Sequence, residues 1–418
     1  MYTAFLILIL LRPFISPEAF PAAGNIYLNL LLICLCVLLC RLLLNRRTDP
    51  GAGFAPLLPA AVFTTTMLPP ALAGNIDGVN LFMNQLACFC AYLLASMMDR
   101  KKSLPVLEVV AAAGTGVAFL ALYQYFYGFR HLSEYLAANG INGGIARDYI
   151  ESGRIFAPFV TANALAGFLA MTIPLRLIRR ETALLPLLLI TPVLLLTKSI
   201  GGITSLICGA ILFFFLSKHR LKKYGFAVFF ILAALAAAVF IFRSAGNQSP
   251  LFSLQARLTY WKEAISIIKA SPVLGNGPGN CAGSVSSFAH NIFLQLWCEL
   301  GIPGITAFLW FIIFTAHKAC GYIRRTGDNL YLLIFCSWTV FLVHNLTDFT
   351  FFLPQVSFIW WLIGGILISA ADRTDAGSDY RLKMNGKGFL FLQKLVGHKN
   401  KDQQSYAEED KPGCKTSA

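Results

Sequence analysis

His290 and Asn291 open a hydrophobic segment, HNIFLQLWCELGIPG, that ends at Gly304. Nine residues separate the His-Asn pair from Gly301, so the pattern is HN-x9-G-x-x-G. The apolar interval indicates a helix that enters a membrane and is broken at Gly301-Ile302-Pro303-Gly304. A neutral imidazole at a membrane boundary can accept a proton from a substrate, and titratable groups in membranes usually serve a function. A packed interfacial histidine fits the position equally well when it is considered alone.

Three cations precede His290 in the chain. Arg257 lies in the segment SLQARLTYWKEAISIIKASP, Arg154 precedes a hydrophobic segment, and Lys198 stands at the end of another. Guanidinium groups bind phosphate oxygens through two hydrogen bonds and stabilise the charge that develops on a leaving group. Each cation alone also fits a side chain that contacts lipid headgroups. Together with His290 they favour a site for a pyrophosphate.

Two more polar features are candidates for the same site. The stretch GNGPGN contains Gly275, Gly277 and Gly279, but it lacks the flanking strand and the Lys-Ser or Lys-Thr of a nucleotide loop. It indicates either a tight turn or a backbone that a substrate approaches closely. His344 and Asp348 are four residues apart and therefore share one face of a helix. Asp348 either orients His344 or forms a structural pair with it.

The composition sets the fold class. The 418 residues are 57% hydrophobic and 13% charged, which excludes a soluble domain and predicts an all-α polytopic membrane protein. We expect roughly twelve transmembrane helices, the first being the uncleaved segment MYTAFLILILLRPF. The others are expected at 26–44, 54–72, 79–98, 104–127, 159–178, 183–198, 200–217, 224–243, 290–317, 330–351 and 354–371.

Lys and Arg in the short connections predict the orientation of these helices. They occur in alternate loops, at 46–47, 100–102, 179–180, 218–223 and 324–325. Because cytoplasmic loops carry the excess of Lys and Arg, both termini are expected in the cytoplasm. The two long loops, at about 128–157 and 244–289, then lie on the outer face, and the second contains an amphipathic surface helix. Residues 1–371 form the membrane domain, and 372–418 are expected to be a poorly ordered cytoplasmic tail.

The cysteines and the net charge point to no further ligand. Most of the eleven cysteines lie in expected spans, so we interpret them as small apolar residues without metal or disulfide partners. The net charge of +14 follows from the basic cytoplasmic loops and tail, and no nucleic acid is expected as a partner.

Residues from about 150 to 371 resemble the O-antigen ligase and polymerase family. The resemblance rests on RLTYWKEAISIIKASPVLGNGPGN, AHNIFLQLWCELGIPG, GRIFAPFVTANALAGF and HNLTDFTFFLP. The matching positions are Arg154, Asn163, Ala166, Gly167, Phe168, Arg257, Trp261, Pro272, Gly275, Gly277, Gly279, His290, Asn291, Gly301, Gly304, His344 and Asp348. The chain departs from the family pattern at Ile200, where a cation is usual, and Lys198 is the nearest replacement.

The resemblance implies a membrane-embedded glycosyltransferase of the lipid-carrier-dependent (GT-C) type. Such an enzyme would move a glycan from undecaprenyl pyrophosphate to an acceptor hydroxyl, such as that of lipid A-core, at the periplasmic face of the bacterial inner membrane. It would need no metal and no cofactor, since the pyrophosphate is already the leaving group. His290 would act as the general base, and Arg154, Arg257 and Lys198 would hold the pyrophosphate. Asn291 and the 275–280 turn would approach the substrate, and the other matching residues would support the site.

Three other functions stay open. A polymerase of O-antigen or exopolysaccharide uses the same donor, as does a protein O-oligosaccharyltransferase. A polysaccharide transporter belongs to another class. It would place charged or discontinuous helices near the middle of the bilayer, whereas the polar groups here are expected at one edge.

Overall fold

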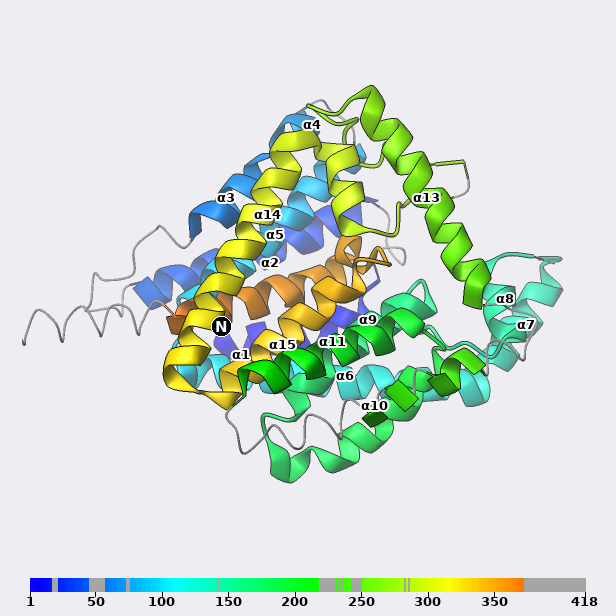
Figure 1. Ribbon diagram of the computed structural model, residues 1–418, viewed down its shortest axis with the longest axis horizontal. Helices are drawn as coiled ribbons and strands as arrows, with labels where there is room; N and C mark the ends of the chain where they lie inside the picture. Colours follow the sequence, from blue (N-terminus) through cyan, green and yellow to red (C-terminus); the bar gives the residue numbers. More distant parts are fainter. Residues whose placement is uncertain are drawn as a thin grey trace, which may run out of the picture. The chain divides into compact units, whose positions relative to one another are not determined.

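A computed structural model of the protein describes residues 1–16, 22–44, 57–72, 76–141, 143–217, 230–231, 233–234, 237–241, 250–281, 283–284 and 286–371. The chain divides into two units, 1–371 and 372–418, and the whole second unit lies outside the described residues, together with the predicted tail. The described part is helical and contains no strand, which confirms the all-α prediction (Figure 1).

The described residues form a series of helices in chain order. They are α1 (Tyr2–Leu11), α2 (Ala22–Leu44), α3 (Leu58–Thr65), α4 (Leu68–Leu72), α5 (Ile76–Ser96), α6 (Arg100–Tyr123), α7 (Phe129–Ala138), α8 (Ile145–Glu151), α9 (Ala162–Arg176), α10 (Leu184–Leu196), α11 (Ile200–Leu216), α13 (Pro250–Ala270), α14 (Ile292–Thr326) and α15 (Asn329–His344). A π-helical turn, Gln124–Gly128, joins α6 to α7, so that 100–138 is one continuous helical segment. A last helix covers Pro354–Ala371.

The expectation of about twelve spans is matched only in part by the described residues. Five helices of the described part are long and apolar enough to cross a membrane, and four more are apolar but shorter. The expected span 54–72 consists of two short helices, α3 and α4. Pro69 and Pro70 explain the break, because proline lacks the N–H that a continuing helix needs and is accepted only in a first turn. The expected span 224–243 lies mostly outside the described residues.

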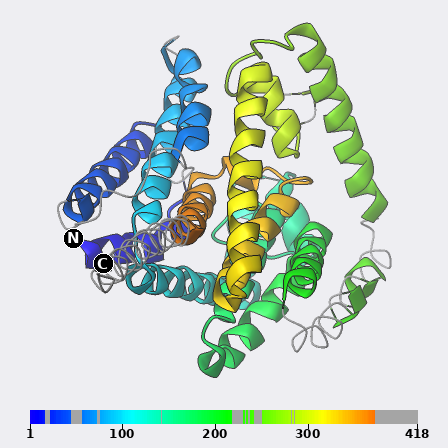
Figure 2. The same ribbon diagram turned by 60° about the vertical axis from the view of Figure 1, so that its left-hand side comes forward.

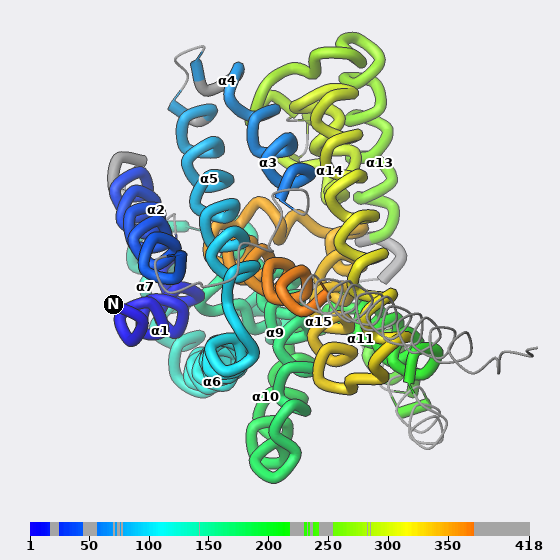
Figure 3. Tube along the Cα trace, turned by 90° about the vertical axis from the view of Figure 1, so that its left-hand side faces the viewer, coloured from blue at the N-terminus to red at the C-terminus, as the bar shows by residue number. Residues whose placement is uncertain are grey.

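The last helix, Pro354–Ala371, is the centre of the core. It runs between α5 and the α14–α15 pair (Figure 3) and is buried along its length. The Trp360 ring stacks on Trp338 of α15 at 5.2 Å, and its Nε1 donates to the Trp338 carbonyl at 3.0 Å. Trp361 stacks on Phe311 of α14 at 4.3 Å. Aromatic rings of this size supply most of the packing area between the helices.

Ion pairs join helix ends at the basic side of the bundle. Arg100 at the start of α6 pairs with Asp328, the N-cap of α15, at 3.0 Å. Arg179, just after α9, pairs with Glu108 of α6 at 2.6 Å. The loops at 100–102, 179–180 and 324–325 therefore share one end of the helices. The opposite ends of α9 and α15 lie about 22–24 Å away, at 1.5 Å per residue.

The break that the sequence indicates at Gly301 is present, but α14 reverses there, so it is a hairpin and not one span over 290–317. Gly301 has φ 64° and ψ −162°, which divides α14 into a first part, Ile292–Leu300, and a second part that continues to Thr326. Phe293 and Phe308 would lie about 22 Å apart in a straight helix. Their ring centroids are 6.1 Å apart, so the first part folds back on the second (Figure 2).

We predict that Gly301→Ala prevents this reversal. The backbone angles of Gly301 are essentially restricted to glycine, and a Cβ there would lie 2.1 Å from the carbonyl oxygen of Val273. The purified variant should unfold at a lower temperature or fail to accumulate. The control is Gly321→Ala in the same helix, where a Cβ meets nothing within 4 Å and alanine should stabilise the helix by roughly 0.5–1 kcal/mol. Equal stability of the two variants would contradict the assigned role of Gly301.

Candidate functional site

The segment between α15 and the last helix, Asn345–Leu353, is the hub of the candidate site. Its carbonyl groups accept hydrogen bonds from three directions: from Ile292 N to Asn345 O at 2.9 Å, from Asn291 Nδ2 to Leu346 O at 3.0 Å, and from Arg257 Nε to Thr347 O at 2.6 Å. The hub therefore joins the start of α14 and the middle of α13 to the end of α15.

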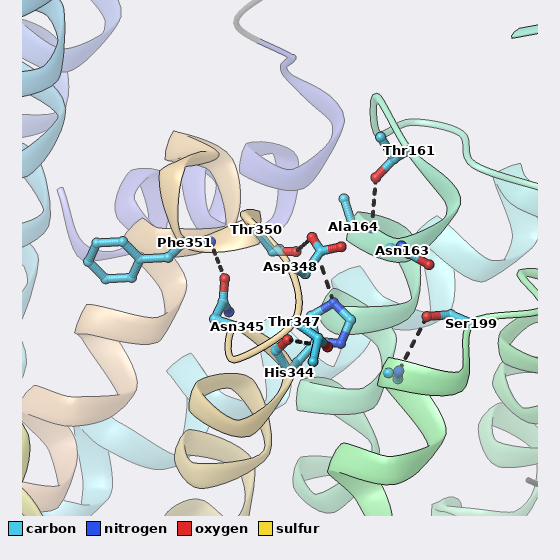
Figure 4. Close-up of polar contacts among 12 residues, drawn as sticks. Thr161, Asn163, Ala164, Ser199, His344, Asn345, Thr347, Asp348, Thr350 and Phe351 are labelled. Carbon is cyan, nitrogen blue, oxygen red and sulfur yellow. Dashed lines mark hydrogen bonds and ion pairs between the residues drawn. The ribbon is translucent and has the colours of Figure 1, made fainter. Parts of the chain in front are cut away.

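His344 ends α15, Asp348 lies within the hub, and both side chains are 1% exposed. Their closest atoms, Nε2 and Oδ1, are 3.9 Å apart, and Asp348 Oδ1 also accepts a 2.7 Å hydrogen bond from Thr350 Oγ1 (Figure 4). Gly167 of α9 packs under the imidazole, where a Cβ would come within 2.3 Å of His344 Cδ2. The structure thus brings this pair together, and a longer side chain at 167 would displace the ring.

The His290 ring lies between two aromatic rings. It stacks on Tyr260 of α13 at 5.3 Å, and Phe349 of the hub meets it edge-on at 5.0 Å. Its Nδ1 is buried and has no hydrogen-bond partner in the part of the chain that the structure describes. Burial lowers the pKa of His290; Asp348 opposes this shift, and the charge of Arg257 lowers the pKa further. The imidazole is therefore neutral near pH 7 and able to accept a proton.

Arg154 lies in the connection between α8 and α9 and is 8% exposed. Its Nε donates to Thr197 O at 2.9 Å, its Nη2 donates to Asn163 Oδ1 at 3.1 Å, and its guanidinium covers the Tyr149 ring at 5.1 Å. Burial lowers the pKa of Arg154, Tyr149 opposes the shift, and the charge of Arg257 lowers it again. The two guanidinium groups are thus close enough to repel each other.

Lys198 follows Thr197 and has a positive φ of 53°. Its Nζ donates to the carbonyl of Ser152, just after α8, at 2.5 Å. This bond ties the long 128–157 connection to the end of α10. The same connection is held on its other side by Gln124, whose Oε1 accepts from the N–H groups of Phe156 and Ala157 at 2.9 Å.

Three helices begin around the hub. Thr161, Ser199 and Asn291 are the N-caps of α9, α11 and α14, and their side chains accept from backbone N–H groups of the first turns. Gly201 lies against the hub, since a Cβ there would be 3.1 Å from Thr347 Oγ1 and 3.6 Å from His344 Nδ1. Helix N-termini carry a partial positive charge, and three of them at one place favour a bound anion.

The glycines of the 275–280 turn serve the hairpin of α14. A Cβ on Gly275 would be 2.5 Å from both Glu299 O and Gly301 N, and Gly277 N donates to Glu299 O at 2.9 Å. Glu299 is nine residues beyond His290, or about 13 Å along a helix. The structure therefore gives the turn a packing role at the hairpin bend and does not bring it to His290. Substrate contact by Gly275, Gly277 or Gly279 stays a prediction.

Two more sequence-predicted residues have packing explanations. Gly304 lies against Leu300, where a Cβ would be 2.2 Å from Leu300 Cβ, so it permits the close return of α14. Trp261 lies partly buried on α13, and its Nε1 has no hydrogen-bond partner among the described residues.

Our interpretation of all the cysteines as unpaired is wrong at one place. Cys281 and Cys298 form a disulfide that fastens the 275–290 segment to the first part of α14. Their separation of 17 residues follows no known ligand spacing, and Cys298 lies within an apolar helix, so the sequence pattern concealed the pair. In addition to these cysteines, the sequence analysis missed Tyr260, Phe349, Gln295 and Glu299. Of these residues, Tyr260 could have been found from the sequence, because it lies three residues after Arg257 and therefore on the same face of the helix.

The fold and the site define an all-helical membrane protein with a cluster of cationic and titratable groups where helix ends meet. Residues 185–309 match the model of the O-antigen ligase family, and this match supports the resemblance to that family. The match includes Arg257, His290 and the hairpin bend at Gly301, and it confirms the resemblance. No curated protein matches the chain.

We predict that Cys281 and Cys298 are linked in the purified protein. Digestion without a reducing agent should yield one linked pair of peptides, which reduction separates and mass spectrometry identifies. The double variant Cys281→Ser/Cys298→Ser should lose up to ~3 kcal/mol of stability, as is typical for a loop of this length. Cys336→Ser, which changes a buried free cysteine of α15, is the control for thiol loss alone. Two free thiols at 281 and 298 in material purified without reductant would contradict the pairing.

Proposed function

We propose that this protein moves a glycan from undecaprenyl pyrophosphate to an acceptor hydroxyl at the periplasmic face of the bacterial inner membrane. The family supports a ligase- or polymerase-type glycosyltransferase. The observation that carries the donor assignment is the pairing of like charges. Arg154 and Arg257 are close enough for Arg257 to depress the pKa of Arg154, and three helix N-termini meet beside them. A pyrophosphate between them would turn this repulsion into attraction.

The reaction is a displacement at the anomeric carbon. The oxygen of the acceptor hydroxyl forms a bond to that carbon while the bond to the pyrophosphate oxygen breaks, and the hydroxyl proton passes to His290. Because Nδ1 of His290 is buried, Nε2 is the nitrogen that would take the proton. Arg154, Arg257 and the helix N-termini would hold the negative charge on the departing undecaprenyl pyrophosphate. No step requires a metal ion or a cofactor.

Two observations support the periplasmic location of the site. The basic loops at 100–102, 179–180 and 324–325 share one end of the helices, and the hub lies at the other end of α9 and α15. Lys and Arg concentrate on the cytoplasmic side of membrane proteins. The disulfide Cys281–Cys298 lies on the hub side, and disulfides persist in the oxidising bacterial periplasm. The two observations are independent and agree on the orientation.

Three kinds of enzyme use this donor and differ only in the acceptor. A ligase transfers the glycan to lipid A-core, a polymerase extends another lipid-linked repeat unit, and a protein O-oligosaccharyltransferase modifies a protein hydroxyl. The mass of the glycosylated product in cells with and without the chain separates them. We place ligation first because the family model that matches is the O-antigen ligase model.

We predict that His290→Ala abolishes transfer and leaves the protein folded. Purified protein in detergent is incubated with radiolabelled lipid-linked glycan and acceptor, and released undecaprenyl pyrophosphate is measured. Loss of the general base should lower turnover by ~10²-fold or more. His317→Ala, a change at a histidine in the second part of α14, is the control. A His290→Ala protein that kept more than about a tenth of wild-type turnover would exclude the base assignment.

The pH dependence of transfer should show the depressed pKa of His290. The active form is the neutral imidazole, and burial lowers its pKa below the ordinary value of 6.5. Activity should therefore stay constant as the pH falls through 6.5 and decline only at lower pH. Arg257→Gln removes a charge that lowers this pKa, so the residual activity should decline at a higher pH than in the wild type. A wild-type decline centred at or above 6.5 would be inconsistent with His290 as the base.

A further inference from the structure

Gln295 and Glu299 are two polar residues buried inside the first part of α14. They are 1% and 3% exposed and lie four residues apart, so they share one face of the helix. Neither was expected from the sequence, and neither has a part in the transfer step described above. Both lie between His290 and the hairpin bend at Gly301.

A continuous line of hydrogen bonds passes through this pair. Gln295 Oε1 accepts from the N–H of Ala289 at 2.7 Å, and Gln295 Nε2 donates to Glu299 Oε1 at 2.6 Å. Glu299 Oε1 also accepts from the N–H of Gly279 at 3.3 Å. The Ala289 amide can only donate, and Glu299 Oε1 acts as an acceptor for Gly279 as well, so both neighbours require the same orientation of the Gln295 amide. The side chain of Gln295 is thus held at both ends.

The pair is expensive to bury. Glu299 Oε2 is buried and has no hydrogen-bond partner among the described residues, and no ion pair to Glu299 occurs among them. Buried carboxylates with an unpaired oxygen destabilise a fold, and apolar residues at both positions would suit a helix packed among apolar neighbours. A cost of this kind is expected where the residues serve the site.

The residue that the pair constrains is His290. The chain has a positive φ of 50° at His290, a conformation that non-glycine residues adopt only when their surroundings impose it. On one side Gln295 fixes the N–H of Ala289, and on the other Asn291 is fixed by its bond to Leu346 O. The ring itself is held by contacts with Tyr260 and Phe349, which restrain its plane but provide no polar anchor.

We propose that Gln295 and Glu299 are positioning residues for His290. Gln295 fixes the backbone before the histidine, and Glu299 holds the amide of Gln295 in the orientation that this requires. The inference rests on the proposed role of His290 as the base. Displacing a catalytic group by about 1 Å can slow a reaction on the order of 10²-fold. Removal of Gln295 should therefore lower kcat and leave the KM for the lipid-linked donor near its wild-type value.

The test compares Gln295→Met with Gln85→Met, because methionine keeps the length and flexibility of glutamine. Gln85 is a buried glutamine of α5, 5% exposed, and serves as the control. A second comparison uses Glu299→Gln, which retains an acceptor for Gln295 Nε2, and Glu299→Met, which does not. Transfer kinetics should show a fall in kcat for Gln295→Met and Glu299→Met only. Glu299→Gln should keep most of the wild-type kcat that Glu299→Met loses.

A second readout does not depend on transfer. Diethyl pyrocarbonate modifies neutral imidazole, and the rate of modification of His290 can be followed by mass spectrometry of its peptide. The exposed His131 in the same protein is the internal standard. The rate at His290 relative to His131 should change in Gln295→Met and Glu299→Met but not in Glu299→Gln or Gln85→Met.

The outcomes separate the inference from the proposed function. If the wild type releases no undecaprenyl pyrophosphate, the proposed function fails, and the labelling rates still decide whether the pair positions His290. Unchanged kcat and unchanged labelling in Gln295→Met overturn the inference. A rise in donor KM at constant kcat also overturns it, since that result would place Gln295 in donor binding. If Gln295→Met does not fold, the comparison of the two Glu299 variants decides. An equal loss of kcat in Glu299→Gln and Glu299→Met contradicts the hydrogen-bond argument.

Discussion

The site depends on three consecutive carbonyl groups of the hub. Asn345, Leu346 and Thr347 each accept one hydrogen bond, and the donors come from α14 and α13. These carbonyls belong to the turn that directly follows α15, where no helix supplies their hydrogen-bond donors. The start of α14 and the side chain of Arg257 satisfy them. The bonds that satisfy the turn after α15 therefore also bring His290, Arg257 and Asp348 together, so the stability of the hub and the geometry of the site are inseparable.

Charge explains why an anion belongs at this place. Arg154 is nearly buried and Arg257 partly so, and Asp348 is the carboxylate that acts on both Arg154 and His290. Among the described residues, one carboxylate against two guanidinium groups and three helix N-termini favours positive potential at the hub. Two neighbouring guanidinium groups are tolerated when a polyanion can bridge them. His290 is kept neutral mainly by its burial, to which the charge of Arg257 adds, until it takes the proton of the acceptor.

The sequence predicted the residue types of the site better than their arrangement. His290, Arg257, Arg154, Asn163, His344 and Asp348 do gather around the hub, although they come from four separate segments. Hydrophobicity predicted the helices, but it could not predict that α14 reverses, since φ at a single glycine decides this and the apolar pattern continues through it. The 275–280 turn was ambiguous for the same reason, because glycine is required both where a substrate approaches and where another backbone does. The disulfide was hidden because distance along the chain does not indicate proximity in space.

The hairpin gives the spacing HN-x9-G-x-x-G a physical meaning. The nine residues Ile292–Leu300 form the first part of α14, so the interval sets how far His290 lies from the bend, about 13 Å at 1.5 Å per residue. A residue inserted or removed would shift His290 by about 1.5 Å along the axis and turn it by about 100° around it. At the far end of this interval, Gly301 and Gly275 lie close enough together for backbone atoms to touch, and the disulfide beside them fixes the register. The bend thus works as a fixed point from which a rigid helix of set length presents the histidine to the hub.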